Sequence, residues 1–415
     1  MKVLHSSDWH IGRALYEKKR YREFEMFLNW LLQAINQQNI DVFLVAGDVF
    51  DTSTPGNRSQ EIYYRFLYQV GSCSCCRHVV VIAGNHDSPS FLSAPKDLLK
   101  ALNVHVIGSA SENYEDEVLV LKDKDDLPEL IVCAVPHLRD RDIRLAQPGE
   151  SIEEKEKKLT EGIRTHYFNV CEAAELKRKE LKVEIPIIAT GHLFTAGGKT
   201  TDGDGVRDLY VGSLAHLTVD VFPSCIDYLA LGHLHMPQKV SDSDMIRYSG
   251  APLQMSFGEA KQQKSVCMIE FEDRSPTVSL IKVPVFQILE SIKGTWEQIE
   301  KRITELLNME SSVWVEVIYE GDEVIGNLRE RLDTLVCGSG IEILRVKNSH
   351  IINMVLNQKF EEECLDDLSM DDVFERCLDI NEVPVEQRAE LLNAYQEIII
   401  SLNEEDKLET SLELQ

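Results

Sequence analysis

The sequence lacks any long hydrophobic run. No uninterrupted apolar segment approaches the roughly 20 residues that a helix needs to cross a bilayer, and the first residues lack the charged and apolar regions of a signal peptide. Internal repeats and low-complexity tracts are also missing, which excludes repeat architectures. We therefore expect a soluble, cytoplasmic protein with no membrane partner. Its 415 residues, 43% hydrophobic and 27% charged, predict two or three globular domains.

A disulfide framework is not expected either. The ten cysteines are scattered, and only Cys73, Cys75 and Cys76 are closely spaced. This cluster could in principle bind a metal, but it lacks a second pair at zinc-site spacing. Reduced thiols at a helix end are the better interpretation.

Positive charge is in short supply, with 43 Lys and Arg against 70 Asp and Glu, a net charge of −27. This balance at first argues against a polyanionic partner. However, about half of the excess lies in residues 351–415, which hold 18 acidic and 4 basic residues. Basic residues gather in three clusters elsewhere: Arg13, Lys18, Lys19, Arg20 and Arg22; Arg139, Arg141 and Arg144; and 177–179. The first cluster is either a solvated helix start or a set of phosphate contacts.

Strand-like and helix-like patterns alternate along the first half of the chain, which predicts α/β architecture. Buried strands are expected at 41–46, 78–83, 185–190 and 226–231, and a capping box of Ser151 and Glu154 opens a helix to Leu181. A βαβαβ unit follows, with strands at 286–292, 313–319 and 341–346 and helices at 296–307 and 326–336. The acidic remainder is typical of a helical pair around Pro384. The predicted domains are 1–283, 284–348 and 349–415.

Metal-ligating side chains follow strand after strand. They are Asp8 and His10 in DWH, Asp48 in AGDVFD, Asn85 and His86 in AGNHD, His192 in TGH, and His233 and His235 in LGHLH. Because the carboxyl ends of strands in open α/β sheets line one crevice, these residues can converge. Four imidazoles, two carboxylates and one amide oxygen are too many for one tetrahedral ion but suit two ions that share a carboxylate, for which Asp48 is our candidate.

The competing interpretation is that these are ordinary core residues. Five separate polar strand ends without a common partner would be costly to bury, which disfavours it for the set as a whole. The remaining histidines have no motif around them and are interpreted as ordinary core residues: His5, His78, His105, His137, His166, His216 and His350.

The order D-x-H, GD-x-x-D, GNHD, GH, GHLH resembles the calcineurin-like metallophosphoesterases. The segments HSSDWHIG, VAGDVFDTSTP, VIAGNHDSP, VRDLYVGSL, DYLALGHLHMPQ and IRYSGAPLQMSF are further similar to nuclease subunits of bacterial double-strand-break repair complexes. The resemblance is strong over residues 1–283 and lies in the arrangement of elements beyond. It implies a four-layer αββα sandwich with a small α+β capping domain and a C-terminal helical pair.

The resemblance also implies a role for each site residue. One metal would be held by Asp8, His10 and His235, the second by Asn85, His192 and His233, with Asp48 bridging both. His86 would face the scissile phosphate, where it stabilises charge or protonates the departing oxygen. Asp51 stands where some relatives have His, and we expect it to orient part of the site. Manganese is the implied metal, although the ligands also suit Mg²⁺, Fe, Zn or Co.

The function implied is a manganese-dependent DNA exonuclease and endonuclease acting on double-strand ends and hairpins. Its partners would be DNA, an ATPase that docks on the C-terminal helical region, and a second copy of the chain in a homodimer. A dimetal phosphodiesterase of small nucleotides remains an alternative. Thr52 occupies the position where phosphoprotein phosphatases carry Arg, which disfavours that class. A non-catalytic adaptor is disfavoured because all seven ligands and His86 are present.

Overall fold

The computed structural model describes residues 1–144, 150–195, 217–309, 311–321, 325, 327–348 and 388. The chain divides into two compact units. Of the described residues, the first holds those within Met1–Ser291, Met309–Glu316 and Gly338–Arg345, and the second holds those within Ile292–Asn308 and Val317–Cys337 together with 346–348.

Two six-stranded sheets form the body of the first unit. The first has the order β14-β13-β1-β4-β5-β6, with β14 Ser275–Lys282, β13 Ser265–Glu272, β1 Lys2–Ser6, β4 Val42–Ala46, β5 His78–Ile82 and β6 Val104–Ile107. The strands from β1 to β6 in this order run parallel, and β13 and β14 are antiparallel to their neighbours. The carboxyl ends of β1, β4 and β5 therefore lie at one edge.

The second sheet has the order β11-β12-β10-β9-β8-β7. Its strands are β11 Gln238–Val240, β12 Ser243–Tyr248, β10 Tyr228–Gly232, β9 Ile187–His192, β8 Pro128–Cys133 and β7 Val118–Lys122. The four strands β12, β10, β9 and β8 run parallel. The ends of β9 and β10 thus lie together, as those of β1, β4 and β5 do.

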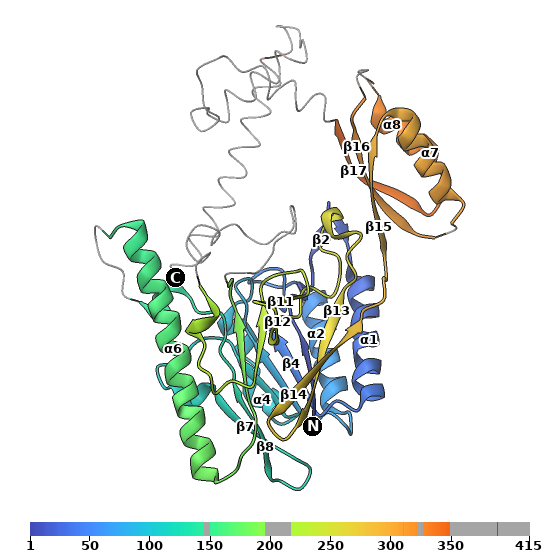
Figure 1. Ribbon diagram of the computed structural model, residues 1–415. Helices are drawn as coiled ribbons and strands as arrows, with labels where there is room; N and C mark the ends of the chain where they lie inside the picture. Colours follow the sequence, from blue (N-terminus) through green and yellow to red (C-terminus); the bar gives the residue numbers. More distant parts are fainter. Residues whose placement is uncertain are drawn as a thin grey trace. The chain divides into compact units, whose positions relative to one another are not determined.

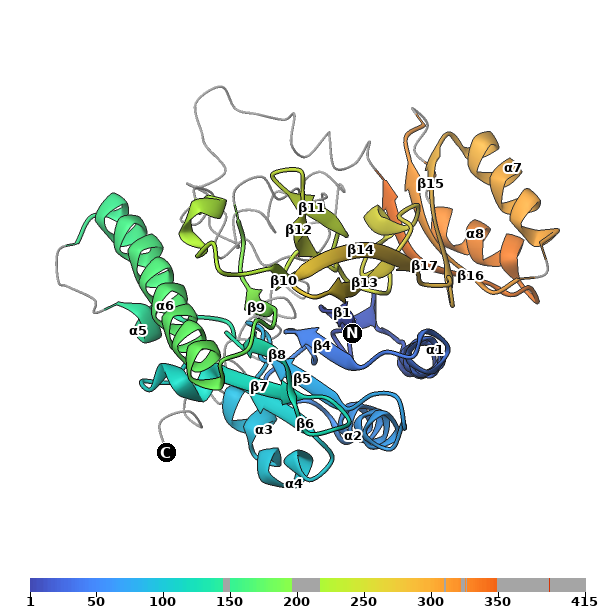
Figure 2. The same ribbon diagram turned by 60° about the horizontal axis from the view of Figure 1, so that its bottom comes forward.

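The sheets pack face to face and each is covered by helices on its other face (Figures 1 and 2). The core between them holds apolar residues of both sheets, for example Val3, Leu44 and Ile82 with Val132 and Ala230. The helices α1 Tyr21–Gln38 and α2 Asn57–Gly71 share a second core with the first sheet, and α6 Ile152–Leu181 shares a third with the second sheet. The αββα sandwich is confirmed.

Shorter elements complete this unit. The helices α3 Pro89–Ser93 and α4 Lys96–Lys100 precede β6, α5 Asp140–Ile143 precedes α6, and a hairpin joins β2 Ala14–Leu15 to β3 Lys18–Lys19. The capping box at the start of α6 is confirmed: Ser151 Oγ accepts from Glu154 N at 3.2 Å, and Glu154 Oε2 accepts from Ser151 N at 3.0 Å.

The predicted βαβαβ unit is also present. Its strands β15 Ile288–Gly294, β16 Val313–Tyr319 and β17 Ile341–Asn348 form a three-stranded sheet with β16 in the middle. Its helices are α7 Trp296–Leu307 and α8 Leu328–Val336, which pack against each other. The helical pair expected in 349–415 lies outside the described residues. Within the part that is described, no helix is both long and apolar enough to cross a membrane.

Candidate metal centre

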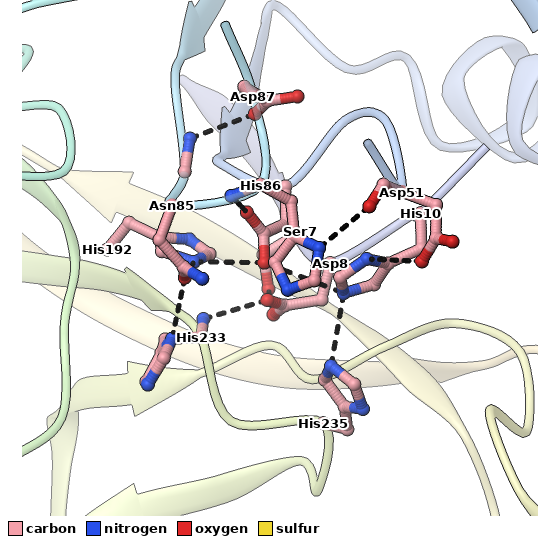
Figure 3. A network of polar contacts seen from close by, with 12 residues as sticks. Ser7, Asp8, His10, Asp51, Asn85, His86, Asp87, His192, His233 and His235 are labelled. Atoms are coloured by element: carbon pink, nitrogen blue, oxygen red, sulfur yellow. Dashed lines mark hydrogen bonds and ion pairs between the residues drawn. The ribbon is translucent and has the colours of Figure 1, made fainter. Parts of the chain in front are cut away.

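All eight predicted site residues meet where five strands end, and Figure 3 labels each of them except Asp48. Asp8 and His10 follow β1, Asp48 follows β4, Asn85 and His86 follow β5, His192 ends β9, and His233 and His235 follow β10. Asn85 and His86 are half-buried and the other six are buried. The strand ends of the two packed sheets therefore bring together residues that are up to 227 positions apart in the sequence.

One half of the centre contains Asp8, His10 and His235, whose ligand atoms lie within 4.8 Å of one another. His10 Nε2 is 3.1 Å from His235 Nε2 and 3.5 Å from Asp48 Oδ2. Burial lowers the pKa of His10 to about 4, so its imidazole is neutral and keeps a lone pair at physiological pH. A buried set of neutral imidazoles and carboxylates fits a divalent cation.

The other half contains Asn85, His192 and His233. Asn85 Oδ1 lies 3.0 Å from His192 Nε2 and 3.0 Å from His233 Nδ1, and His192 Nε2 is 3.3 Å from Asp48 Oδ2. The same oxygen of Asp48 thus faces both halves. Burial lowers the pKa of His233 well below its usual value, which again favours the neutral ligand form.

Asp48 and His192 form a buried ion pair. Burial opposes the charge on both, yet His192 and His10 hold the pKa of Asp48 well below its usual range. Asp48 in turn raises the pKa of His192 to about 9 against the effect of burial. If His192 binds a divalent ion, its imidazolium would have to lose a proton.

His86 lies at the open side of the centre. Its main-chain N–H donates to Asp48 Oδ1 at 2.9 Å, and its ring Nδ1 donates to the Asp51 carbonyl oxygen at 2.7 Å. Asp51 Oδ1 is also 3.4 Å from His10 Nδ1 and 3.6 Å from Arg13 Nη1. Asp51 therefore contacts two of the predicted site histidines, one through its main chain and one through its side chain.

Backbone geometry at the centre is unusual for non-glycine residues. Asp8, His10, Asp48 and His233 have φ of 53°, 48°, 51° and 103°. Glycine is required nearby for space: a Cβ on Gly84 would lie 2.1 Å from Asp48 Oδ1. Strained backbone of this kind typically clusters at functional sites.

Asp87 had no role predicted from its motif, although it holds two strand ends together. Its buried carboxylate accepts from the main-chain N–H groups of Val49 at 3.1 Å, Phe50 at 2.9 Å and Gly84 at 2.9 Å. Burial and the neighbouring Asp48 raise the pKa of Asp87 to about 7. The loops that carry Asp48 and Asn85 are thereby tied together.

Three further residues near the centre had no motif to reveal them. His137, interpreted from the sequence as an ordinary core histidine, places its Nδ1 3.0 Å from the His192 carbonyl oxygen. Glu259 and Lys264 form a buried ion pair beside His235. Burial raises the pKa of Glu259, but His235 and Lys264 outweigh it and lower that pKa to about 2.

Two other sequence features are placed by the structure. Arg20 is buried and pairs with Glu23 through two hydrogen bonds of 2.7 and 2.8 Å, so its guanidinium is held inside the fold. Cys73, Cys75 and Cys76 are free thiols that follow α2.

Comparison with known proteins gives matches over most of the chain. The family model described as calcineurin-like phosphoesterase matches residues 1–237, and one described as type 5 capsule protein repressor C-terminal domain matches residues 285–382. The chain is 33% identical to SbcD of the nuclease SbcCD of Escherichia coli K12 over 95% of this chain and 97% of that protein. The SbcD proteins of Rhodobacter capsulatus and Bacillus subtilis are 33% and 32% identical, each over 65% of this chain and 66% of theirs.

Proposed function

The chain belongs to the calcineurin-like phosphoesterases and, within them, to the SbcD family of SbcCD nuclease subunits; from this premise we propose that it hydrolyses DNA phosphodiester bonds with two divalent metal ions. It would act as an exonuclease on double-strand ends and as an endonuclease on single strands and hairpins, in DNA recombination, repair and replication. The observation that carries the proposal is that Asp48 Oδ2 faces two separate groups of nitrogen and oxygen ligands.

The ligand assignment follows the two groups. Asp8, His10 and His235 would hold one ion, and Asn85, His192 and His233 the other, with Asp48 between them. When bound, two such ions lower the pKa of a shared water and neutralise the phosphodiester under attack. The chain's own residues would determine where the ions bind, because both sets of ligands lie at the ends of packed strands.

His86 is proposed as the catalytic residue. Since Nδ1 donates to the Asp51 carbonyl, the neutral ring keeps the lone pair on Nε2, and the protonated ring carries an N–H there. In the protonated form Nε2 can donate to a phosphate oxygen or protonate the departing oxygen. Half-burial leaves the ring accessible to substrate.

Manganese is the proposed metal. Imidazole ligands suit ions such as Zn and Fe, while the two carboxylates and the amide oxygen favour a harder ion such as Mn²⁺ or Mg²⁺. The mixed set of Asp48, His192 and Asn85 is compatible with Mn²⁺, and the four histidines make Mg²⁺ the less suitable ion.

The partners follow from the family. DNA is the substrate, and the acidic region 349–415 would bind an SbcC-like ATPase and need not touch DNA. The nuclease region 1–283 would form a homodimer within a heterotetramer, and region 284–348 would cap the active site and help to bind DNA. With DNA as the substrate, we expect the protein in the cytoplasm.

The test is cleavage of a labelled hairpin-ended duplex by the full chain with Mn²⁺, with Mg²⁺ or with chelator. Cleavage should require Mn²⁺ and should disappear in Asp48→Asn, because the shared anionic ligand is lost. Asp125→Asn is the matched control, since Asp125 is exposed and precedes β8, at the opposite end of the parallel strands from His192. A cyclic dinucleotide is tested in parallel. Hydrolysis of this diester with intact DNA would contradict the DNA assignment and favour a small-nucleotide phosphodiesterase.

A further inference from the structure

A buried ion pair lies on the far side of His235 from His10. Glu259 ends a short 3₁₀ turn, Phe257–Glu259, and Lys264 lies at the start of the β13 region; their side chains are 1% and 2% exposed. Two charges removed from water lose much of their hydration, and a buried pair is in general a weak source of stability. This pair is therefore expected to do something besides stabilise the fold.

The pair contacts His235 at two points. Lys264 Nζ donates to the His235 carbonyl oxygen at 3.0 Å, and Glu259 Oε1 lies 3.6 Å from His235 Nδ1. Glu259 Oε1 and His235 Nδ1 are both buried, and neither atom has a hydrogen-bond partner among the described residues. His235 Nε2, on the other side of the ring, is the atom that faces His10.

The two carboxylate oxygens of Glu259 have different surroundings. Oε2 accepts from Lys264 Nζ and from the main-chain N–H of Met255 at 3.1 Å. Oε1 is left to face His235. A carboxylate has acceptors only, so its free oxygen can be satisfied by a protonated Nδ1 and not by a lone pair.

We propose that Glu259 is a positioning residue that holds His235 in the tautomer with hydrogen on Nδ1, so that Nε2 presents its lone pair to a metal ion. Lys264 fixes the carboxylate through Oε2 and fixes the main chain of His235. The inference rests on the proposed function, because it requires His235 to be a metal ligand. Carboxylates that accept from the second nitrogen of a ligating histidine are known to orient the ring and strengthen metal binding.

The substitution Glu259→Gln separates this role from simple charge pairing. Lys264 Nζ and Met255 N are donors, so the glutamine oxygen must face them, and its NH₂ group must then face His235 Nδ1. This amide favours a lone pair on Nδ1 and hydrogen on Nε2, which is the wrong tautomer for a metal ligand. The shape of the side chain is unchanged.

The experiment measures Mn²⁺ binding to the full chain by calorimetry and by electron paramagnetic resonance, with thermal unfolding of the metal-free protein as a check of fold. We expect the wild-type chain to bind two ions. In Glu259→Gln we expect one of the two ions to bind 10–100-fold more weakly than in wild type. The Asn85, His192 and His233 half should be unaffected. Glu61→Gln is the matched control, because Glu61 pairs with Arg58 and Arg65 at the exposed surface.

Two outcomes overturn the inference. If a folded Glu259→Gln variant binds two ions with unchanged affinity, Glu259 only balances the charge of Lys264 and does not position His235. If that variant does not fold, nitrogen-15 NMR of the wild-type histidines tests the role instead. The His235 signal is assigned as the one that is lost in His235→Gln. A His235 ring with its hydrogen on Nε2 would refute the proposed role of Glu259. A wild-type chain that fails to bind two ions would instead refute the proposed function.

Discussion

Truncation of Asp87 to alanine should loosen the loops that carry Asp48 and Asn85. The change removes the acceptor of three buried main-chain N–H groups, those of Val49, Phe50 and Gly84. Each buried donor left without an acceptor costs about 1–3 kcal/mol, and since neighbouring losses are not additive, the total is on the order of 5 kcal/mol. That is a large part of the roughly 5–15 kcal/mol that stabilises a typical folded protein.

Urea unfolding of the metal-free full chain measures this loss, and hydrogen exchange with mass spectrometry locates it. In Asp87→Ala the first unfolding transition should move to lower urea, and the three amides should exchange faster than in wild type. Asp125→Ala serves as the control, because Asp125 is exposed. A loss below about 1 kcal/mol together with unchanged protection of the three amides would refute the reasoning, since such donors cannot be left unsatisfied so cheaply.

Two further predictions concern metal uptake. Gly84→Ala should lower Mn²⁺ affinity, because the new Cβ would lie 2.1 Å from Asp48 Oδ1. The control Gly56→Ala should bind Mn²⁺ as wild type does, because its Cβ meets nothing within 4 Å. Equal Mn²⁺ affinity of the two variants in calorimetry would contradict this prediction. Although burial opposes the charge on His192, Asp48 raises the pKa of its imidazole to about 9. A proton must therefore leave His192 when an ion binds to it, and the affinity for Mn²⁺ should rise between neutral pH and about pH 9. Calorimetry in buffers of different ionisation enthalpy counts that proton, and a pH-independent affinity without proton release would show that His192 is not a ligand.

The convergence of Asp8, Asp48 and His192 could be predicted from the sequence because each lies at the end of a buried parallel strand or within two residues of it. Strand direction alone places such residues at one edge, so no long-range information was needed. Glu259 has no such constraint. It lies in a turn 24 residues after His235, and only the path of the chain between β12 and β13 brings the two together. The position of His137 could not be predicted for a similar reason, because His137 contacts the main chain of His192 and belongs to no motif.

The strained conformations of the proposed ligands indicate that contacts within the protein set their positions. A left-handed non-glycine residue costs on the order of 1–3 kcal/mol and persists only where surrounding contacts over-determine it. Such contacts are present: the main-chain N–H of Asp8 donates to the Gly47 carbonyl and that of His10 to the Asp48 carbonyl, both at 3.0 Å. Asp8 Oδ1 in turn accepts from the main-chain N–H of His233 at 2.8 Å, which ties the end of the first sheet to that of the second. These bonds join protein groups of both sheets, so the sandwich itself holds the two ligand groups in register.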